Sequence, residues 1–228
     1  MTLRLFCSVM LISTAVSASD MPLAVGDVVT GPHSHVRLTN NARQPVTAWS
    51  LAASSPSPNG GTHREVYTAD GYLSEVTHGL PGANERLERL MPGESRELPL
   101  DPLPAGSTVA VVAAVLDDGT AVGEDAAVAS IFARRAKERD ALKSVVDAFD
   151  EVLPSKHGAD ALSTLRERFA ALAQRDDAMP CRAALDAVQQ FQRKTNAEEI
   201  DRSLQTYADF VKREYDLAAR HATRRRGN

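Results

Sequence analysis

The apolar residues of this chain change their spacing at about Glu124, and this change limits the folds that the chain can adopt. Before it, short runs alternate apolar and polar residues in steps of two, as strands with one buried face do. After it, apolar residues recur three and four positions apart, as on the buried face of a helix. Because the strands precede the helices along the chain, the sequence predicts an α+β protein, with a sheet region at residues 19–123 and a helical region at residues 124–228.

Short apolar runs between turns predict an antiparallel, immunoglobulin-like β-sandwich in the first region. The expected strands are VRLTN at 36–40, VTAWSLAAS at 46–54, SRELPL at 95–100 and STVAVVAAVL at 107–116. In the run at 46–54, alternation puts Trp49 and Leu51 on the face opposite Val46. The run at 107–116 is apolar on both faces, which is typical of a central strand. Asp118-Gly119 after it predicts a tight hairpin.

Three to four amphipathic helices are predicted for the second region. The first spans residues 124–153 and ends before Pro154. Arg135 and Arg139 interrupt its apolar face, so we expect its middle to project beyond the sandwich. The later stripes are Leu162, Leu165, Phe169 and Leu172, then Leu185, Val188 and Phe191, then Ile200, Leu204, Tyr207 and Val211. Asn196 and Glu199 occupy capping-box positions before the last stripe. Each stripe must be buried against another helix or the sheet.

Residues 1–18 have the layout of a secretory signal peptide. Arg4 provides the basic start, an apolar run follows from Leu5 to Val16, and small residues end it at Ala18. The run is too short to span a bilayer after normal cleavage, and no second long apolar run follows. We therefore expect an exported protein, periplasmic or secreted, with no transmembrane segment in the mature chain.

Removal of the signal peptide leaves Cys181 as the one cysteine of the mature chain. An intrachain disulfide is then impossible, and so are zinc sites that need several cysteines. Cys181 follows Pro180 at a predicted helix start, where a reactive thiol can lie. A nucleophile also needs a base held nearby, and no local motif provides one. We expect Cys181 to be a small buried residue.

The charge of the chain is unevenly distributed. Residues 19–123 carry six Lys or Arg against twelve Asp or Glu, whereas the whole chain has a net charge of −4. An acidic first region is the opposite of what a polyanion-binding surface requires. The sequence therefore argues against a nucleic-acid partner.

The stretch at 54–89 is long, rich in Gly and Pro, and predicted to be mostly loop. Asp70-Gly71 could form a hairpin within it. Tyr67 and Tyr72 would offer amphipathic contact area to a partner, since long loops on a rigid sandwich are common binding surfaces. These two tyrosines are the candidate binding residues. The alternative is that both pack the loop onto the sheet.

Four histidines of the first region are the candidate metal ligands: His33, His35, His63 and His78. His33 and His35 are two residues apart, so a strand would place them on one face. A catalytic zinc needs three such ligands and an open position. The chain has no HExxH motif, no GxSxG elbow and no glycine-rich phosphate loop. We expect no catalytic residue, no bound metal and no cofactor, and a metal-dependent exported enzyme using these loop histidines is the alternative.

Three segments carry a resemblance to a known group: NNARQPVTAW at 40–49, LMPGESREL at 90–98 and VAVVAAVLDDGTAVGE at 109–124. In these segments the chain resembles uncharacterised exported bacterial proteins with an immunoglobulin-like β-sandwich followed by a long charged helix. The resemblance covers about residues 36–150. It implies the fold and transfers no functional residue.

These observations together predict a non-enzymatic binding or structural module of the bacterial cell envelope. Its partner would be a protein or another envelope component. Amphipathic helices that are not covered within the chain would also allow self-association, so a homo-oligomer formed through the helices is a further expectation.

Overall fold

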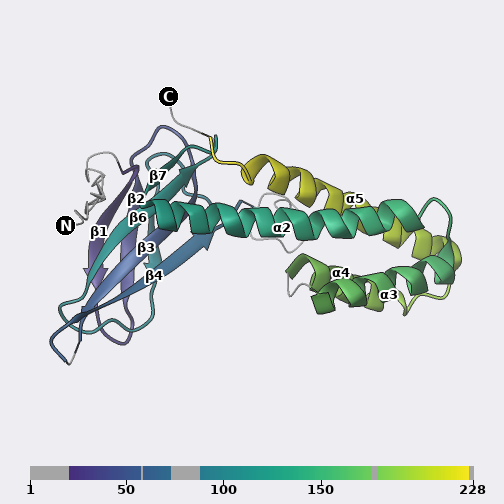
Figure 1. Ribbon diagram of the computed structural model, residues 1–228, viewed down its shortest axis with the longest axis horizontal. Helices are drawn as coiled ribbons and strands as arrows, with labels where there is room; N and C mark the ends of the chain where they lie inside the picture. The colour runs from purple at the N-terminus through teal and green to yellow at the C-terminus, as the bar shows by residue number, and fades with distance from the viewer. Residues whose placement is uncertain (1–20, 58, 73–87, 176–178, 226–228) are drawn as a thin grey trace, which may run out of the picture.

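The structure is a computed structural model, and it describes residues 21–57, 59–72, 88–175 and 179–225. The described residues form two antiparallel sheets of seven strands in total, followed by four helices. The helical part extends from one side of the sandwich, and the long helix α2 runs through both parts (Figure 1). The predicted α+β fold with strands before helices is confirmed.

The first sheet has three strands in the order β1-β2-β5. Its strands are β1 (Leu23–Val29), β2 (His35–Asn40) and β5 (Ser95–Pro99). The sequence pattern predicted β2 and β5 but missed β1. The reason is a bulge between Val25 and Val28, where the pairing with β2 shifts register. The extra residue breaks the alternation that marks a strand.

The second sheet has four strands in the order β4-β3-β6-β7. Its strands are β3 (Val46–Pro56), β4 (Thr62–Asp70), β6 (Thr108–Leu116) and β7 (Ala121–Gly123). The run at 107–116 is confirmed as a central strand, since β6 lies between β3 and β7. The prediction of a loop over 54–89 is wrong for residues 54–56 and 62–70, which belong to β3 and β4. These strands pair as an antiparallel hairpin, and the backbone N–H of Ser57 donates to the carbonyl oxygen of Gly61 at 2.8 Å.

Trp49 and Leu51 of β3 face the first sheet, where they pack with Leu38 of β2 and with the other buried residues of the sandwich core. Val46 belongs to this same core, although alternation predicts it on the opposite face. Its register with β6 shifts between Val46 and Ala48, so Thr47 is the extra residue of a bulge. The bulge brings Val46 back to the side of Trp49.

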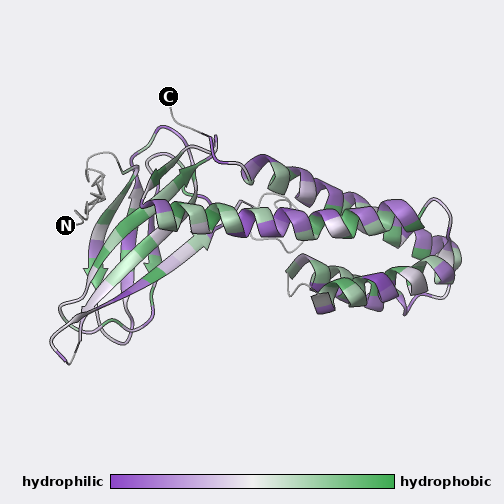
Figure 2. Cartoon of the chain, viewed as in Figure 1, coloured by the Kyte–Doolittle hydropathy of each residue, from purple (hydrophilic) through white to green (hydrophobic). Residues whose placement is uncertain are grey.

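The opposite face of the second sheet is covered by α2 (Asp125–Val152). Val128 and Ile131 of α2 pack on Ala48, Ala113 and Val115, and all five are buried. This contact explains why β6 is apolar on both faces, one side facing the first sheet and the other facing a helix. Farther along α2 the hydrophobic colour gives way to charged residues in Figure 2.

The step from β7 into α2 requires glycine at position 123. Gly123 has a φ of +127°, and an added Cβ would lie 2.2 Å from the carbonyl oxygen of Val112. The next residue, Glu124, donates its backbone N–H to that same oxygen at 2.7 Å. The chain therefore leaves the sheet in close contact with β6, in a conformation that other residues rarely adopt.

The other helices are α3 (Gly158–Arg175), α4 (Met179–Phe191) and α5 (Ala197–His221), and each has a buried stripe as predicted. Phe149 of α2 anchors the bundle core, with its ring edge-on to Phe169 of α3 and to Tyr207 of α5. Asn196 caps α5 by accepting the N–H of Glu198. No helix among the described residues is long and apolar enough to cross a membrane.

Helix α5 runs antiparallel to α2 and returns the chain to the sandwich (Figure 1). Just after α5, the backbone N–H of Arg225 donates to the carbonyl oxygen of Gly119 at 2.9 Å. Gly119 lies in the turn between β6 and β7, where the predicted Asp118-Gly119 hairpin forms with a φ of +84° at the glycine. The sandwich is thus joined to the bundle at two places, the start of α2 and the end of α5.

Candidate functional site

The described histidine candidates do not come together: His33 and His35 lie just before and at the start of β2, and His63 lies in β4 of the other sheet. His35 begins β2, and its Nδ1 lies 3.1 Å from the carbonyl oxygen of His33. His63 lies in β4 of the other sheet, opposite Ser55. His78 lies outside the described residues. Within the described ranges, no three His, Cys, Asp or Glu side chains are placed to hold one metal ion.

The two candidate binding tyrosines have different surroundings. Tyr67 on β4 is half-buried against the sandwich core, and its hydroxyl donates to Oε2 of Glu65 at 2.8 Å. Tyr72, just after β4, is 1% exposed and belongs to the bundle core. Tyr72 therefore packs among the helices of the bundle rather than onto the sheet. It does not offer contact area at the surface.

Arg135 of α2 is the largest fully buried side chain in the described part of the chain. Its guanidinium donates to both carboxylate oxygens of Asp70, from Nε at 2.7 Å and from Nη2 at 2.9 Å. It also donates to the hydroxyl of Thr47 at 3.0 Å and to the carbonyl oxygen of His221 at 3.1 Å. Together with Tyr72, whose ring lies 4.9 Å from the guanidinium carbon, these residues form what we call the junction cluster.

The junction cluster joins the sheet to both helices that leave it. Thr47 and Asp70 come from β3 and β4, Arg135 from α2 and His221 from the end of α5. A buried charge is costly unless it is paired and hydrogen-bonded, and the two-pronged contact with Asp70 meets that condition. The Thr47 hydroxyl is satisfied as well, since it donates onward to the carbonyl oxygen of Val115 at 3.2 Å. The cluster fixes the position of the bundle relative to the sandwich.

The place of His221 in this cluster disfavours the charged form of its imidazole. Its ring centroid lies 5.2 Å from that of Tyr72. Burial, and then the positive charge of Arg135, lower the pKa of His221 below its ordinary value. A neutral imidazole avoids a second positive charge beside the guanidinium.

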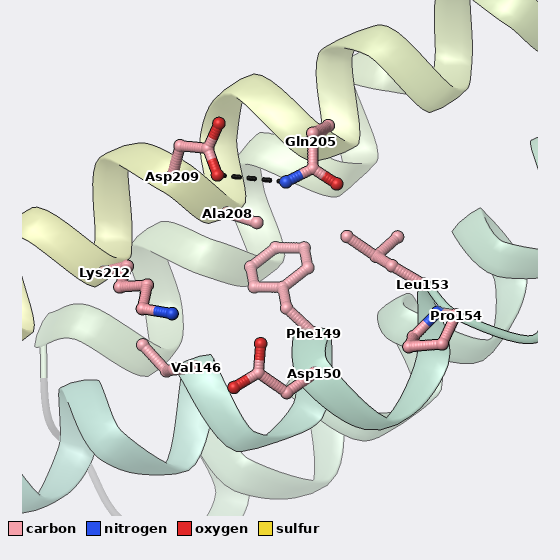
Figure 3. A pocket seen from close by; sticks show the side chains of 9 residues that line it. All are labelled: Val146, Phe149, Asp150, Leu153, Pro154, Gln205, Ala208, Asp209 and Lys212. Atoms are coloured by element: carbon pink, nitrogen blue, oxygen red, sulfur yellow. Dashed lines mark hydrogen bonds between the residues drawn. The ribbon is translucent and has the colours of Figure 1, made fainter.

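A groove of about 390 Å³ lies between α2 and α5, toward the end of the bundle that points away from the sandwich (Figures 1 and 3). We call it the distal groove, and it is lined by Val146, Phe149, Asp150, Leu153, Pro154, Gln205, Ala208, Asp209 and Lys212. Its lining is apolar at Phe149 and Leu153 and charged at Asp150, Asp209 and Lys212. Gln205 donates to Asp209 across one turn of α5 at 2.9 Å. Such a surface suits an apolar side chain next to a polar group.

A smaller cavity of about 100 Å³ lies between α2, α4 and α5, on the side of the bundle nearer the sandwich. We call it the carboxylate cavity, and it is lined by Glu138, Leu142, Met179, Pro180, Ala183, Tyr207, Val211 and Glu214. Two carboxyl groups thus face an otherwise largely apolar space. Glu138 accepts a hydrogen bond from the Tyr72 hydroxyl at 3.0 Å, so this cavity adjoins the junction cluster.

Cys181 lies in the first turn of α4 and is 1% exposed, within the bundle core. Its place fits the expectation of a small buried residue. A buried thiol in apolar surroundings is less reactive than an exposed one.

No protein-family model matches the chain, and neither a curated protein nor a solved structure shows significant similarity to it. The resemblance to exported bacterial proteins therefore stays a prediction.

The sequence pattern missed the junction cluster and the carboxylate cavity, although it contained a signal for both. On α2 the inward-facing positions follow a regular spacing of three and four, and all are buried except the half-buried Glu138: Val128, Ile131, Arg135, Glu138, Leu142, Val145, Phe149 and Val152. Arg135 therefore continues the apolar face that the sequence predicts it to interrupt, and Glu138 continues that face as well. On α5, Glu214 and His221 continue the stripe of Tyr207 and Val211 in the same way. Charged residues at stripe positions indicate buried polar contacts.

Proposed function

We propose that the protein is an exported, non-enzymatic binding module of the bacterial cell envelope, which uses its helical arm to hold a protein partner. The observation that carries the proposal is the distal groove, an open site of about 390 Å³ at the far part of the arm. The layout of a signal peptide at residues 1–18 supports export.

The chemistry of the distal groove favours a protein partner. Phe149 lines the groove and is 2% exposed. Edge-on contacts with the rings of Phe169 and Tyr207 hold its ring in place. A residue that is already fixed loses little conformational freedom when a partner binds. Asp150 and Lys212 carry opposite charges on facing helices, so a partner side chain can be positioned by charge as well as by apolar contact.

The attachment of the arm also supports a binding role. The junction cluster ties α2 and the end of α5 to the sheet through Arg135. A groove on a rigid element is held in a defined position, which a binding site on a mobile loop is not. The sandwich would then act as the base of the module and the bundle as its recognition element.

Site-specific photo-crosslinking in cells that export the protein tests this proposal. A photoreactive residue at Gln205, which lines the groove, should give a discrete adduct with an envelope protein. The matched control is Gln190, which is exposed on α4 and does not line the groove. A second substitution, Ala208→Phe, should fill the groove and remove the Gln205 adduct while the helical circular dichroism stays unchanged.

Two outcomes would overturn the proposal. Equal adducts from Gln205 and Gln190, or none from either, would show that the groove is not a binding site. An adduct of twice the mass of the chain would show that the groove takes a second copy rather than another envelope protein. Amino-terminal sequencing of the exported protein tests the first part of the proposal, with a start near Ser19 as the expected result.

A further inference from the structure

The carboxylate cavity places two acidic side chains from different helices in one confined space. Glu138 comes from α2 and Glu214 from α5, both are half-buried, and the two helices pack against each other. Leu142 and Val211, each 2% exposed, form part of the same wall. Two like charges in such surroundings repel each other and are poorly hydrated, so ionising both carboxyl groups is unfavourable.

The two carboxyl groups have unequal partners. Glu138 accepts the hydrogen bond from the Tyr72 hydroxyl and is attracted by Arg134. Of the two carboxyl groups, Glu138 therefore ionises more readily than Glu214. Glu214 has no hydrogen bond or ion pair with any residue that the structure describes. Burial, followed by the charge of Glu138, raises the pKa of Glu214 to about 7. Burial also raises the pKa of Glu138 above its ordinary value.

Among the described residues that line the cavity with Glu214, none supplies a compensating charge. From α2 it faces Glu138, and the positive charges of Arg134 and Arg135 act to lower the pKa of Glu138. From α4 the lining is Met179, Pro180 and Ala183, which are apolar, and Asp186 acts on the nearby ring of Tyr207. From α5 itself the neighbour is Tyr207, and Tyr72 approaches only through Glu138. The described lining contains no positive side chain.

We propose that Glu138 and Glu214 form a proton-controlled latch between α2, α4 and α5. With Glu214 protonated, α4 stays packed over the cavity through Met179, Pro180 and Ala183. When that proton is lost, both carboxylates require hydration, and α4 moves away from α2 and α5 to admit water, which exposes Leu142 and Val211. The proton passes to solvent, and no covalent bond changes.

The direction of the pH effect follows from the protonation states. In the open form Glu214 is hydrated and has an ordinary glutamate pKa, so the closed form binds the proton more tightly. Closure is then favoured at acid pH, and the open fraction rises as pH increases through the interval from the ordinary value up to about 7. Above that interval both forms are ionised and the open fraction stays constant.

Hydrogen exchange on the full-length mature protein tests the latch. After correction for the intrinsic exchange rate, the amides of residues 183–190 in α4 should exchange at least about tenfold faster at pH 7.5 than at pH 5. Glu214→Gln should exchange slowly at both pH values, because an amide cannot ionise. Glu138→Gln should shift the change toward lower pH, since the repelling charge is gone.

The matched control is Glu167→Gln, an exposed residue of α3 that should keep the wild-type pH dependence. A carboxyl ¹³C titration gives a second readout, with Glu214 expected to titrate near pH 7. The latch is refuted if α4 exchange does not depend on pH in the wild type. It is also refuted if Glu214→Gln keeps that dependence, or if Glu214 titrates at the ordinary glutamate value.

Discussion

Arg135 is the residue whose surroundings decide how the two parts of the protein are joined. Its side chain and that of Asp70 are 0% and 1% exposed, and they form a two-pronged pair at 2.7 and 2.9 Å. A buried ion pair of this kind adds little stability compared with a well-packed apolar pair. Removing one partner is different, because it leaves the other charge buried and uncompensated.

Arg135→Met should therefore destabilise the protein by about 3–5 kcal/mol. Methionine keeps much of the volume, so the main loss is the neutralisation of Asp70. Urea unfolding followed by circular dichroism measures the change. The control is Arg139→Met, whose side chain is about one-third exposed and pairs with its neighbour Asp140. It should change stability by less than about 1 kcal/mol. Equal effects from the two substitutions would contradict the role assigned to Arg135.

The sequence could not identify the role of Arg135, although its position in the stripe is readable. The partner carboxylate lies 65 residues away, in a strand that belongs to the other part of the fold. Periodicity describes which residues share a face, but it does not show what that face meets. Glu138 and Glu214 present the same difficulty, since their proximity depends on how α2 and α5 pack.

At the scale of elements, the sequence predicted every helix and most of the strands. Two of the failures arise from bulges in the sheets, whereas β4 lies in a Gly- and Pro-rich stretch whose composition favoured a loop. A bulge near Val25 hid β1, and another at Thr47 moved Val46 to the unexpected face. Each bulge adds one residue to a strand, so a strict two-residue alternation is lost at that point. The helices have no such irregularity in their buried stripes, and they were easier to recognise.

The connection between β7 and α2 should not tolerate a side chain at Gly123. Gly123→Ala puts a Cβ 2.2 Å from the carbonyl oxygen of Val112, in a backbone region of positive φ. We expect a loss of at least about 2 kcal/mol in the free energy of unfolding. Gly61→Ala, at the β3–β4 turn, is the matched control, because nothing lies within 4 Å of its added Cβ. Equal losses of melting temperature in Gly123→Ala and Gly61→Ala would contradict the steric requirement for glycine at position 123.

At the scale of the whole molecule, sandwich and bundle should unfold as one unit. They share α2, the junction cluster and the contact between Arg225 and Gly119. The protein provides separate probes of the two parts. Trp49, the one tryptophan, is buried in the sandwich core, and circular dichroism at the helical wavelength reports mainly on the bundle.

We expect the fluorescence of Trp49 and the helical signal to change at the same urea concentration in the wild type. In Arg135→Met the two transitions should separate, with one part unfolding before the other. Coincident transitions in that variant would mean that the remaining contacts alone are enough to couple the two parts. Separate transitions in the wild type would mean that the parts are independent from the start.

Helix α2 has a mechanical consequence for the distal groove. About 21 residues of α2 lie beyond Ile131, the last fully buried α2 residue of the cluster on the sheet, which corresponds to about 30 Å of helix. A tilt of about 10° at the base of such a lever displaces its tip by about 5 Å. Small changes in the tilt of α2 near Arg135 would thus become large displacements of the distal groove. The Arg135–Asp70 contact therefore limits how far the groove can move relative to the sandwich.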